Sequence, residues 1–481
     1  MAEFHIEHFG CRAARADGEA VSSRLRAAGL SEGSPAAADV VVVNTCSVTA
    51  EADRAARAFI RRTHRRNPDA RIVVTGCYAQ RAPEELAAMA GVAAVIGNSH
   101  KALAPDIVLD VAGGTLAART STGGDLVHLR ALVGPSGVSS AQIWADDLFA
   151  HSFIEEAQLL PGAQTRPNLK IQEGCGNRCT FCVIPQTRGG SRSLAVDAIM
   201  RQVQGFVAGG GIELVLSGIN LGRWGRDLPQ KENTPRTLAA LARQILESGL
   251  PRLRLSSIEP MDWDAELIAL MAEFGCASAP PHDARFGRLA RHAHLPLQSG
   301  CDAVLRRMHR RYRPWHYRDK VETLFNAAGP ELTLGADVMV GFPGETDAEF
   351  QETLELVRAL PFGYLHLFPF SARPGTKGWA LHAECPVAPE AVEERMTELR
   401  GVAAEKSRTH RMRFIGREFE CISMRTPDAI AAQNRTSALT DNFLPLEIDG
   451  RFAANQLLNV RISGMESDGT LRAVGAACFA C

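Results

Sequence analysis

The chain has 481 residues, of which 46% are apolar and 22% are charged, and its formal net charge is −1. This length exceeds one ordinary domain and predicts two or three. The balanced charge excludes nucleic-acid binding by an overall positive field, so local basic patches would have to hold such a partner. The first residues carry charges where a signal peptide is apolar, and no apolar run is long enough to span a bilayer. We therefore expect a cytoplasmic protein that makes no membrane contact.

The first hundred residues repeat one pattern three times, a short β-branched run that ends in a cysteine and is followed by a helical stretch. The runs are "EFHIEHFGC", "ADVVVVNTC" and "ARIVVTGC", and the helical stretches are Asp17–Ala28, Ala50–Asn67 and Pro83–Ala90. This alternation predicts a parallel α/β domain over residues 1–115. The carboxyl ends of parallel strands share one edge, so we expect Cys11, Cys46 and Cys77 to meet there.

Residues 116–165 contain the turn-like stretches "TSTGGD" and "VGPSGVSS" and are predicted to be a linker. Residues 166–400 then repeat a strand–helix unit six times, which predicts a partial (β/α)6 barrel with functional residues directly after each strand. The expected strands are Leu169–Gln172, Glu213–Ser217, Arg252–Ser256, His294–Leu297, Thr333–Val340 and Leu365–Phe370. The expected helices include Ala195–Ala208, Thr237–Ser248, Trp315–Ala328 and Asp347–Ala359.

The C-terminal part has a different pattern. A helical stretch runs from Pro389 to about Arg411, and the short runs "REFECISM", "NFLPLEI" and "LLNVRISG" follow it. Short strands separated by polar turns predict a small β-barrel over residues 408–476.

The stretch "IQEGCGNRCTFCVIPQTRGGSRS" directly follows the first expected barrel strand and contains Cys175, Cys179 and Cys182. The chain has twelve cysteines, and in a reducing compartment they serve metal binding or catalysis more often than disulfides. Three thiolates on one loop can hold three irons of a [4Fe–4S] cluster and leave the fourth iron free to bind a substrate. The alternative is a zinc knuckle whose fourth ligand lies elsewhere.

Several stretches in a fixed order carry a resemblance that covers almost the whole chain. They are "VVVNTCSVTAEADR", "VVTGCYAQR", "KIQEGCGNRCTFCVIP", "LSGINLG", "RLSSIEP", "HLPLQSG", "VGFPGET" and "FPFSARPGT". Together with the cysteine pattern they resemble the methylthiotransferase family of the radical S-adenosylmethionine (SAM) superfamily.

The resemblance implies two [4Fe–4S] clusters. One, on Cys175, Cys179 and Cys182, would cleave SAM to a radical that abstracts hydrogen from an unactivated carbon. The other, on the three N-terminal cysteines, would carry or supply sulfur, and a second SAM would donate the methyl group. The family further implies a C-terminal TRAM-like RNA-binding barrel, an electron donor such as flavodoxin or ferredoxin, and a sulfur source.

The family modifies three kinds of substrate, and this sequence most resembles the group that acts on threonylcarbamoyladenosine 37 of tRNA at carbon C2. The segments "KIQ", "RLSSIEP" and "VVVNTCSVTAEADRAAR" favour that group. The alternatives within the family are isopentenyladenosine in tRNA and an aspartate of a ribosomal protein. From a different class, the alternative is a non-catalytic, zinc-stabilised RNA-binding protein.

The loops after the barrel strands are expected to form the SAM pocket, and Arg311 in "MHRRYR" is a candidate partner of the SAM carboxylate. The other candidates are Gly218, Asn220, Ser257, Glu259, Gln298, Gly341 and Pro343. Alternatively, the glycines and the proline only shape loops, and Arg311 is a solvated arginine.

Two basic runs are candidates for tRNA contact, because arginine contacts to phosphate supply most non-specific RNA affinity. The candidate residues are Arg57, Arg61, Arg62, Arg65, Arg66, Arg411 and Arg413. The alternative for each is a solvated charged face. Phe443 is expected to be a core aromatic residue rather than a platform for a base.

The sequence departs from the family pattern at Ala14, where an asparagine is usual, which puts the local geometry near Cys11 in doubt. The segment "ASAPPHDARFGRLAR" is longer than usual. No role is assigned to the remaining cysteines Cys276, Cys301, Cys385, Cys421, Cys478 and Cys481, the last two of which are expected to lie in a frayed tail.

Overall fold

The computed structural model describes residues 2–114, 141–149, 152, 154, 159, 166–229, 234–275 and 288–478. Most of the predicted linker, Cys276, Cys481 and most of the long "ASAPPHDARFGRLAR" segment lie outside these ranges. The chain divides into two compact units. The first comprises Met1–Gln158, Glu173–Arg192 and Ser371–Trp379, and the second comprises Leu159–Gln172, Ser193–Phe370 and Ala380–Cys481. Both groups of candidate cluster cysteines therefore belong to the first unit.

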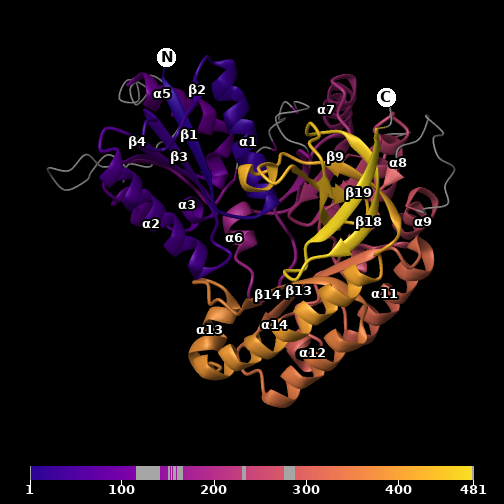
Figure 1. Ribbon diagram of the computed structural model, residues 1–481. Coiled ribbons are helices and arrows are strands. Elements are labelled where there is room, and N and C mark those ends of the chain that lie inside the picture. Colours follow the sequence, from indigo (N-terminus) through magenta and orange to yellow (C-terminus); the bar gives the residue numbers. More distant parts are fainter. Residues whose placement is uncertain are drawn as a thin grey trace. The chain divides into compact units, whose positions relative to one another are not determined.

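The first unit is built on a six-stranded sheet in the order β2-β1-β3-β4-β5-β6, with every neighbouring pair parallel. Figure 1 labels strands β1 to β4 of this sheet. The strands are β1 Glu3–His8, β2 Ser31–Glu32, β3 Val40–Thr45, β4 Arg71–Gly76, β5 Val92–Gly97 and β6 Gln142–Trp144. The expected parallel sheet is thus confirmed. The sheet continues at β6 within the residues that the sequence pattern assigned to the linker.

Helices cover both faces of this sheet. Helices α1 (Arg12–Ala27) and α5 (Ala104–Gly113) pack on one face, and α2 (Ala50–Arg66), α3 (Cys77–Arg81) and α4 (Pro83–Ala87) pack on the other. Helix α1 begins five residues before the expected Asp17, because the alanine-rich segment after Cys11 is helical and buries Ala13 and Ala16.

The second unit contains two sheets that include all six expected strands. The first has the order β11-β10-β9-β7-β8 and the second the order β12-β13-β14. The pairs β7–β9, β9–β10, β10–β11, β12–β13 and β13–β14 are all parallel. The strands are β7 Asn168–Glu173, β8 Arg192–Ser193, β9 Glu213–Gly218, β10 Arg252–Leu255, β11 Arg288–Leu289, β12 His292–His294, β13 Thr333–Val340 and β14 Phe362–Pro369.

The fourth expected strand is displaced. The strand β12 ends at His294, where the prediction had it begin and continue to Leu297. Pro296 has no N–H to contribute to a ladder, whereas the N–H groups of Leu295, Leu297 and Gln298 donate to carbonyls of β13, those of Gly335 and Asp337.

Helices cover one face of these sheets and share a large apolar core with them. The main helices are α7 Val196–Ala208, α8 Leu238–Leu246, α9 Ala265–Phe274, α11 Pro314–Ala328, α12 Asp347–Ala359 and α14 Pro389–Met412. The start of α12 is set by a capping box between Thr346 and Glu349, in which each side chain bonds the other's backbone N–H. The four helices that the sequence analysis named for residues 166–400 are all present as α7, α8, α11 and α12, and the predicted helix from Pro389 is α14.

The C-terminal residues form a closed five-stranded barrel in the order β15-β16-β17-β19-β18, as expected. Its strands are β15 Glu418–Ser423, β16 Arg435–Thr440, β17 Pro445–Asp449, β18 Leu457–Met465 and β19 Leu471–Cys478. The sequence pattern had missed β16 and β19, and Cys478 ends β19 where a frayed tail was expected. Alternate residues of β18, among them Leu458, Val460 and Ile462, fill the barrel core.

The C-terminal barrel packs on the amino-terminal ends of strands β10 and β12 within the second unit. Arg252 pairs with Glu420, and Arg254 donates to the carbonyl of Thr440 at 3.2 Å. The ring of Phe443 lies 4.3 Å from the ring of His292, centroid to centroid. Phe443 is therefore a packed aromatic residue, as expected. In the part of the chain that the structure describes, no helix is both long and apolar enough to cross a membrane.

Candidate cluster sites

The three N-terminal cysteines follow three neighbouring strands. Cys11 comes after β1 and precedes α1, Cys46 directly follows β3, and Cys77 directly follows β4 as the first residue of α3. Gly10 adopts φ +145°, and a Cβ at this position would lie 2.9 Å from Cβ of Cys46, so only glycine lets the first loop approach the second. The parallel order β1-β3-β4 thus brings the three loops to one edge of the sheet.

The three thiols are close enough to influence one another electrostatically. Burial raises the pKa of the Cys46 thiol to about 12, and the neighbouring Cys77 and Cys11 contribute in the same direction. Cys46 and Cys77 are buried, whereas Cys11 is exposed. Ionising three neighbouring thiols is unfavourable when no cation is present, because the thiolates repel one another. A bound metal cation compensates this negative charge, and the thiolates are then favourable ligands. This donor set fits an iron–sulfur group with three protein ligands.

A buried arginine lies beside this group. Arg188, the last residue of α6 (Ile184–Arg188), is 1% exposed, and its Nε donates to Sγ of Cys77 at 3.2 Å. Asn98 Nδ2 donates to the same sulfur at 3.4 Å. The Nη2 atom of Arg188 is buried and has no hydrogen-bond partner among the described residues. A buried donor of this kind requires an acceptor, and a sulfide of a cluster on Cys77 would supply one.

Arg188 also takes part in a buried network of four charges. Its Nη1 donates to Asp17 at 3.0 Å and to Glu173 at 2.8 Å, and Lys101 pairs with the same two carboxylates. Glu173 is fully buried and immediately precedes the cysteine loop. Pairing of cations with carboxylates is the condition under which such charges tolerate burial. The network therefore ties the start of the cysteine loop to the N-terminal sheet.

The loop with Cys175, Cys179 and Cys182 begins at Gly174, whose φ is +67°. A Cβ on Gly174 would lie 2.0 Å from the carbonyl oxygen of Gly190, so a larger residue does not fit. The N–H of Cys175 donates to the carbonyl of Gly189 at 3.1 Å, and that of Cys182 donates to the carbonyl of Cys179 at 3.2 Å. All three cysteines are partly exposed. The loop thus presents three accessible thiols from a constrained backbone.

The residues expected to bind SAM lie in the second unit, after strands β9, β10, β12 and β13. Gly218 ends β9 and lies against Gln172, whose Oε1 also accepts from the N–H of Asn220 at 2.7 Å. Gln298 has φ +62° and is 7% exposed, and its Oε1 has no partner among the described residues. Such a buried polar atom fits a site that binds a polar ligand.

The two charged candidates have protein partners. Glu259 pairs with Arg310, a neighbour of the expected Arg311. Arg311 itself lies 3.3 Å from Asp262 and is 41% exposed. Ser257 and Pro343 lie in the loops after β10 and β13, and the N–H of Gly341 donates to Glu345 at 2.7 Å.

The candidate RNA-binding arginines separate into two kinds. Those on α2 are mostly exposed, and no described carboxylate pairs with four of them, Arg61, Arg62, Arg65 and Arg66. Arg57 is engaged with Tyr78 and with Glu85. In the C-terminal region, Arg411 donates to the carbonyl of Gly469 and the exposed Arg413 donates to the carbonyl of Pro330.

Comparison with known proteins identifies the family. The radical SAM superfamily matches residues 169–357, and the uncharacterised protein family UPF0004 matches residues 3–97. The threonylcarbamoyladenosine tRNA methylthiotransferase MtaB of Bacillus subtilis is 32% identical over 451 residues, which cover 94% of this chain and 91% of that protein. The chain belongs to the radical SAM methylthiotransferase family.

Other family members agree. The threonylcarbamoyladenosine tRNA methylthiotransferase MtaB of Aquifex aeolicus is 33% identical to this chain, and the alignment covers 88% of this chain and 91% of that protein. The tRNA-2-methylthio-N(6)-dimethylallyladenosine synthase of Cereibacter sphaeroides is 33% identical to this chain, and the alignment covers 86% of this chain and 85% of that protein. Among solved structures, the radical SAM methyltransferase TsrM of Kitasatospora setae has a similar fold, with a TM-score of 0.50 and 14% identity over 80% of this chain and 75% of that one.

As a member of this family, the protein is a transferase that uses SAM and a [4Fe–4S] cluster.

Sequence reasoning missed the residues that support the cysteines, above all Arg188, Glu173, Asp17 and Lys101. Arg188 lies inside the cysteine-rich stretch, but its contact with Cys77 joins residues 111 positions apart. An asparagine does contact the backbone at position 14, but it comes from β3: the side chain of Asn44 donates to the carbonyl of Ala14.

Proposed function

We propose that this methylthiotransferase inserts a methylthio group at C2 of N6-threonylcarbamoyladenosine 37 in tRNA. The observation that carries the proposal is the presence of two groups of three cysteines in one compact unit, each on loops shaped to present their thiols. The substrate follows from the several relatives named for it at about 30% identity over most of the chain. The second candidate is the dimethylallyl-modified adenosine of tRNA, for which other relatives of similar identity are named.

We assign two iron–sulfur clusters to these thiols. Cys175, Cys179 and Cys182 would hold the cluster that cleaves SAM, and Cys11, Cys46 and Cys77 would hold an auxiliary one. When bound, the first cluster supplies the electron for that cleavage, and the auxiliary cluster supplies or carries the sulfur. The contribution of the chain is to hold three ligands per cluster and leave one iron open, and to donate hydrogen bonds from Arg188 and Asn98 to Cys77.

We assign the SAM pocket to the loops that follow the barrel strands. Asn220 and Gln298 are buried and polar, and Ser257 and Glu259 follow β10. Glu259 is the candidate acceptor for ribose hydroxyls, since its ion pair with Arg310 fixes the carboxylate in place. Gly218, Gly341 and Pro343 shape this edge. Arg311 would have to leave Asp262 to reach a SAM carboxylate.

We propose that tRNA is bound by arginines of α2 and by the C-terminal barrel acting as a TRAM-like module. The exposed Arg61, Arg62, Arg65 and Arg66, with which no described carboxylate pairs, are the best placed to meet phosphates. The reaction would take place in the cytoplasm and require an electron donor such as flavodoxin or ferredoxin, and a sulfur source.

The test is mass spectrometry of tRNA nucleosides from a strain that lacks this gene, carrying either the wild-type gene, a Cys46→Ala variant or an empty vector. We expect 2-methylthio-threonylcarbamoyladenosine only with the wild-type gene. Restoration of the methylthiolated dimethylallyl nucleoside instead would move the assignment to the second substrate. If neither nucleoside changes, iron and sulfide analysis of the purified protein decides between an enzyme with another substrate and a zinc-stabilised RNA-binding protein.

A further inference from the structure

Strands β12, β13 and β14 carry an unusual set of polar side chains on the face opposite the helices. Along each strand, alternate residues such as Ala293, Leu334 and Ala336 belong to the apolar core under the helices. The residues between them therefore point to the other face of the sheet. On that face lie two histidines of β12, one aspartate of β13, and a tyrosine and a histidine of β14.

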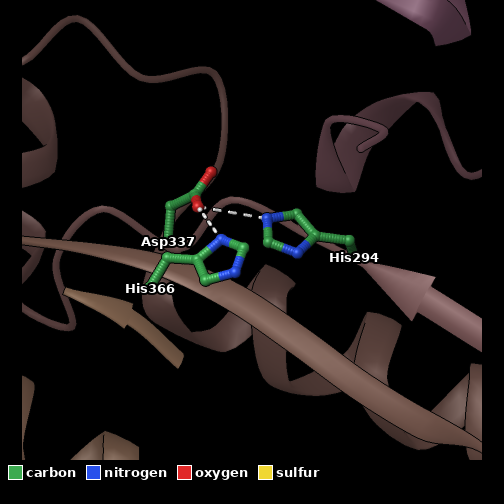
Figure 2. A group of neighbouring side chains, drawn as sticks. All are labelled: His294, Asp337 and His366. Carbon is green, nitrogen blue, oxygen red and sulfur yellow. Dashed lines mark hydrogen bonds and ion pairs between the residues drawn. The ribbon is translucent and has the colours of Figure 1, made fainter. Parts of the chain in front are cut away.

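Three of these side chains converge. His294 Nε2 lies 3.2 Å from Oδ1 of Asp337, and His366 Nδ1 lies 3.3 Å from the same oxygen. The three ligand atoms all lie within 4.8 Å of one another. Figure 2 shows both imidazole rings turned toward the carboxylate between them. The parallel register places Asp337 directly opposite His366, so the convergence follows from the sheet itself.

The two nitrogen–oxygen separations match those expected for ligands of a single metal ion. With metal–ligand distances of about 2.1 Å, adjacent ligand atoms lie about 3.4 Å apart around a tetrahedral ion and about 3.0 Å apart around an octahedral one. Both measured N–O distances fall within this interval. They are longer than the usual N–H···O hydrogen bond of about 2.9–3.0 Å.

A second residue orients the buried histidine. The hydroxyl of Tyr364 lies 3.0 Å from Nδ1 of His294, on the opposite side of the ring from Asp337. When a histidine binds a metal through one nitrogen, its other nitrogen usually donates to a fixed partner, which sets the tautomer and the ring orientation. Tyr364 is itself held by His292 at 2.8 Å. The histidine is thus prepared to bind through Nε2.

We propose that His294, Asp337 and His366 form a binding site for one divalent transition-metal ion of the Zn²⁺ type. Two imidazoles and one carboxylate are a ligand set that such ions prefer. The exposed fraction rises from 8% for His294 to 26% for Asp337 and 63% for His366. One side of the ion would therefore be accessible and would take oxygen ligands such as a carboxylate, a hydroxyl or water. None of the three residues is a proposed cluster ligand or a proposed SAM-binding residue, so the ion would occupy a site that the proposed function does not assign.

The test uses cluster-loaded protein whose iron and sulfide contents are measured first, so that the cysteines are already occupied. The protein is equilibrated with Zn²⁺ under anaerobic conditions, and bound zinc is measured by mass spectrometry and by X-ray absorption at the zinc edge. We expect a single additional zinc ion with a shell of nitrogen and oxygen at about 2.0–2.1 Å and no sulfur.

Two variants and a matched control decide the outcome. Asp337→Asn and the exposed His366→Ala should each weaken zinc binding at least about tenfold, while His316→Ala, which removes an exposed histidine of α11, should not. Equal zinc uptake by wild-type protein and Asp337→Asn would overturn the proposal. A sulfur shell would also overturn it, because the ion would then sit on thiolates, and so would the absence of zinc in the wild-type protein.

Discussion

The charge network around Arg188 allows a quantitative prediction of stability. In Arg188→Met, the carboxylates of Asp17 and Glu173 lose a guanidinium at 3.0 and 2.8 Å and keep their ion pairs with Lys101. Removing one partner from a buried ion pair costs about 3–5 kcal/mol. Asp17 is 18% exposed and Lys101 still compensates in part, so we expect the lower end of this range, about 3 kcal/mol.

For a compact unit of roughly 150–250 residues, a loss of about 3 kcal/mol lowers the melting temperature by about 6–12 °C. The measurement is differential scanning calorimetry of cluster-free protein, with hydrogen exchange of peptides from β3 and β4 to report on the first unit. Cluster-free protein is used so that the change reflects the ion pairs rather than a loss of iron.

The double variant Asp17→Asn with Arg188→Met is the matched control. Removing Asp17 relieves one uncompensated charge, so the double variant should be more stable than the sum of the two single changes predicts, by at least about 1 kcal/mol. The reasoning would be refuted if Arg188→Met lowered the melting temperature by less than about 2 °C, because the network would then contribute little. It would also be refuted if the losses of unfolding free energy in the two single variants summed to that of the double variant within about 0.5 kcal/mol.

Three further predictions concern the cysteine loop, the interior charges and the RNA surface. Gly174→Ala should lose the iron held by the Cys175 loop, because the added Cβ would lie 2.0 Å from the carbonyl oxygen of Gly190. The control Gly176→Ala should keep this iron, because no neighbouring atom lies within 4 Å of a Cβ at that position. Equal iron contents of the two variants would contradict the prediction. Burial alone would raise the pKa of Glu213, but Arg254 and Arg252 lower it to about 2, so its stabilisation is complete above its usual pKa of about 4.5 and is lost as pH falls toward 2. Glu213→Gln should therefore lower the free energy of unfolding by about 3 kcal/mol at pH 7. In denaturant titrations, the difference in unfolding free energy between wild type and variant should become smaller below about pH 4.5, and a difference that does not change with pH would count against this reasoning. The third change replaces the exposed arginines of α2 by glutamine, at Arg61, Arg62, Arg65 and Arg66. The slope of log tRNA affinity against log salt concentration, measured by fluorescence anisotropy, should fall by up to about 0.7–0.9 for each phosphate that is no longer neutralised. The control Arg54→Gln removes an arginine of the same helix that is paired with Glu51, and it should leave this slope unchanged.

The fold class and the two cysteine groups were accessible from the sequence, because both depend on local patterns and one general rule. The runs before Cys46 and Cys77 are β-branched and short, so they form strands, and parallel strands end at a common edge. The same rule located the loops after β9, β10 and β13. Strands β16 and β19 were missed because their composition is mixed, "RTSALT" and "LRAVGAAC". Strand β12 ends at His294, two residues before Pro296, which cannot donate to a ladder.

The sequence by itself determined which residues can bind metal and where along the chain they lie, since thiols, turns and strand periodicity are local properties. Only the tertiary structure decided what surrounds them. Arg188 reaches Cys77 because α6 lies beside α3, and His294, Asp337 and His366 meet because three strands are aligned in one register. Contacts of this kind join residues tens to more than a hundred positions apart. They depend on packing and register, which no local pattern of residues encodes.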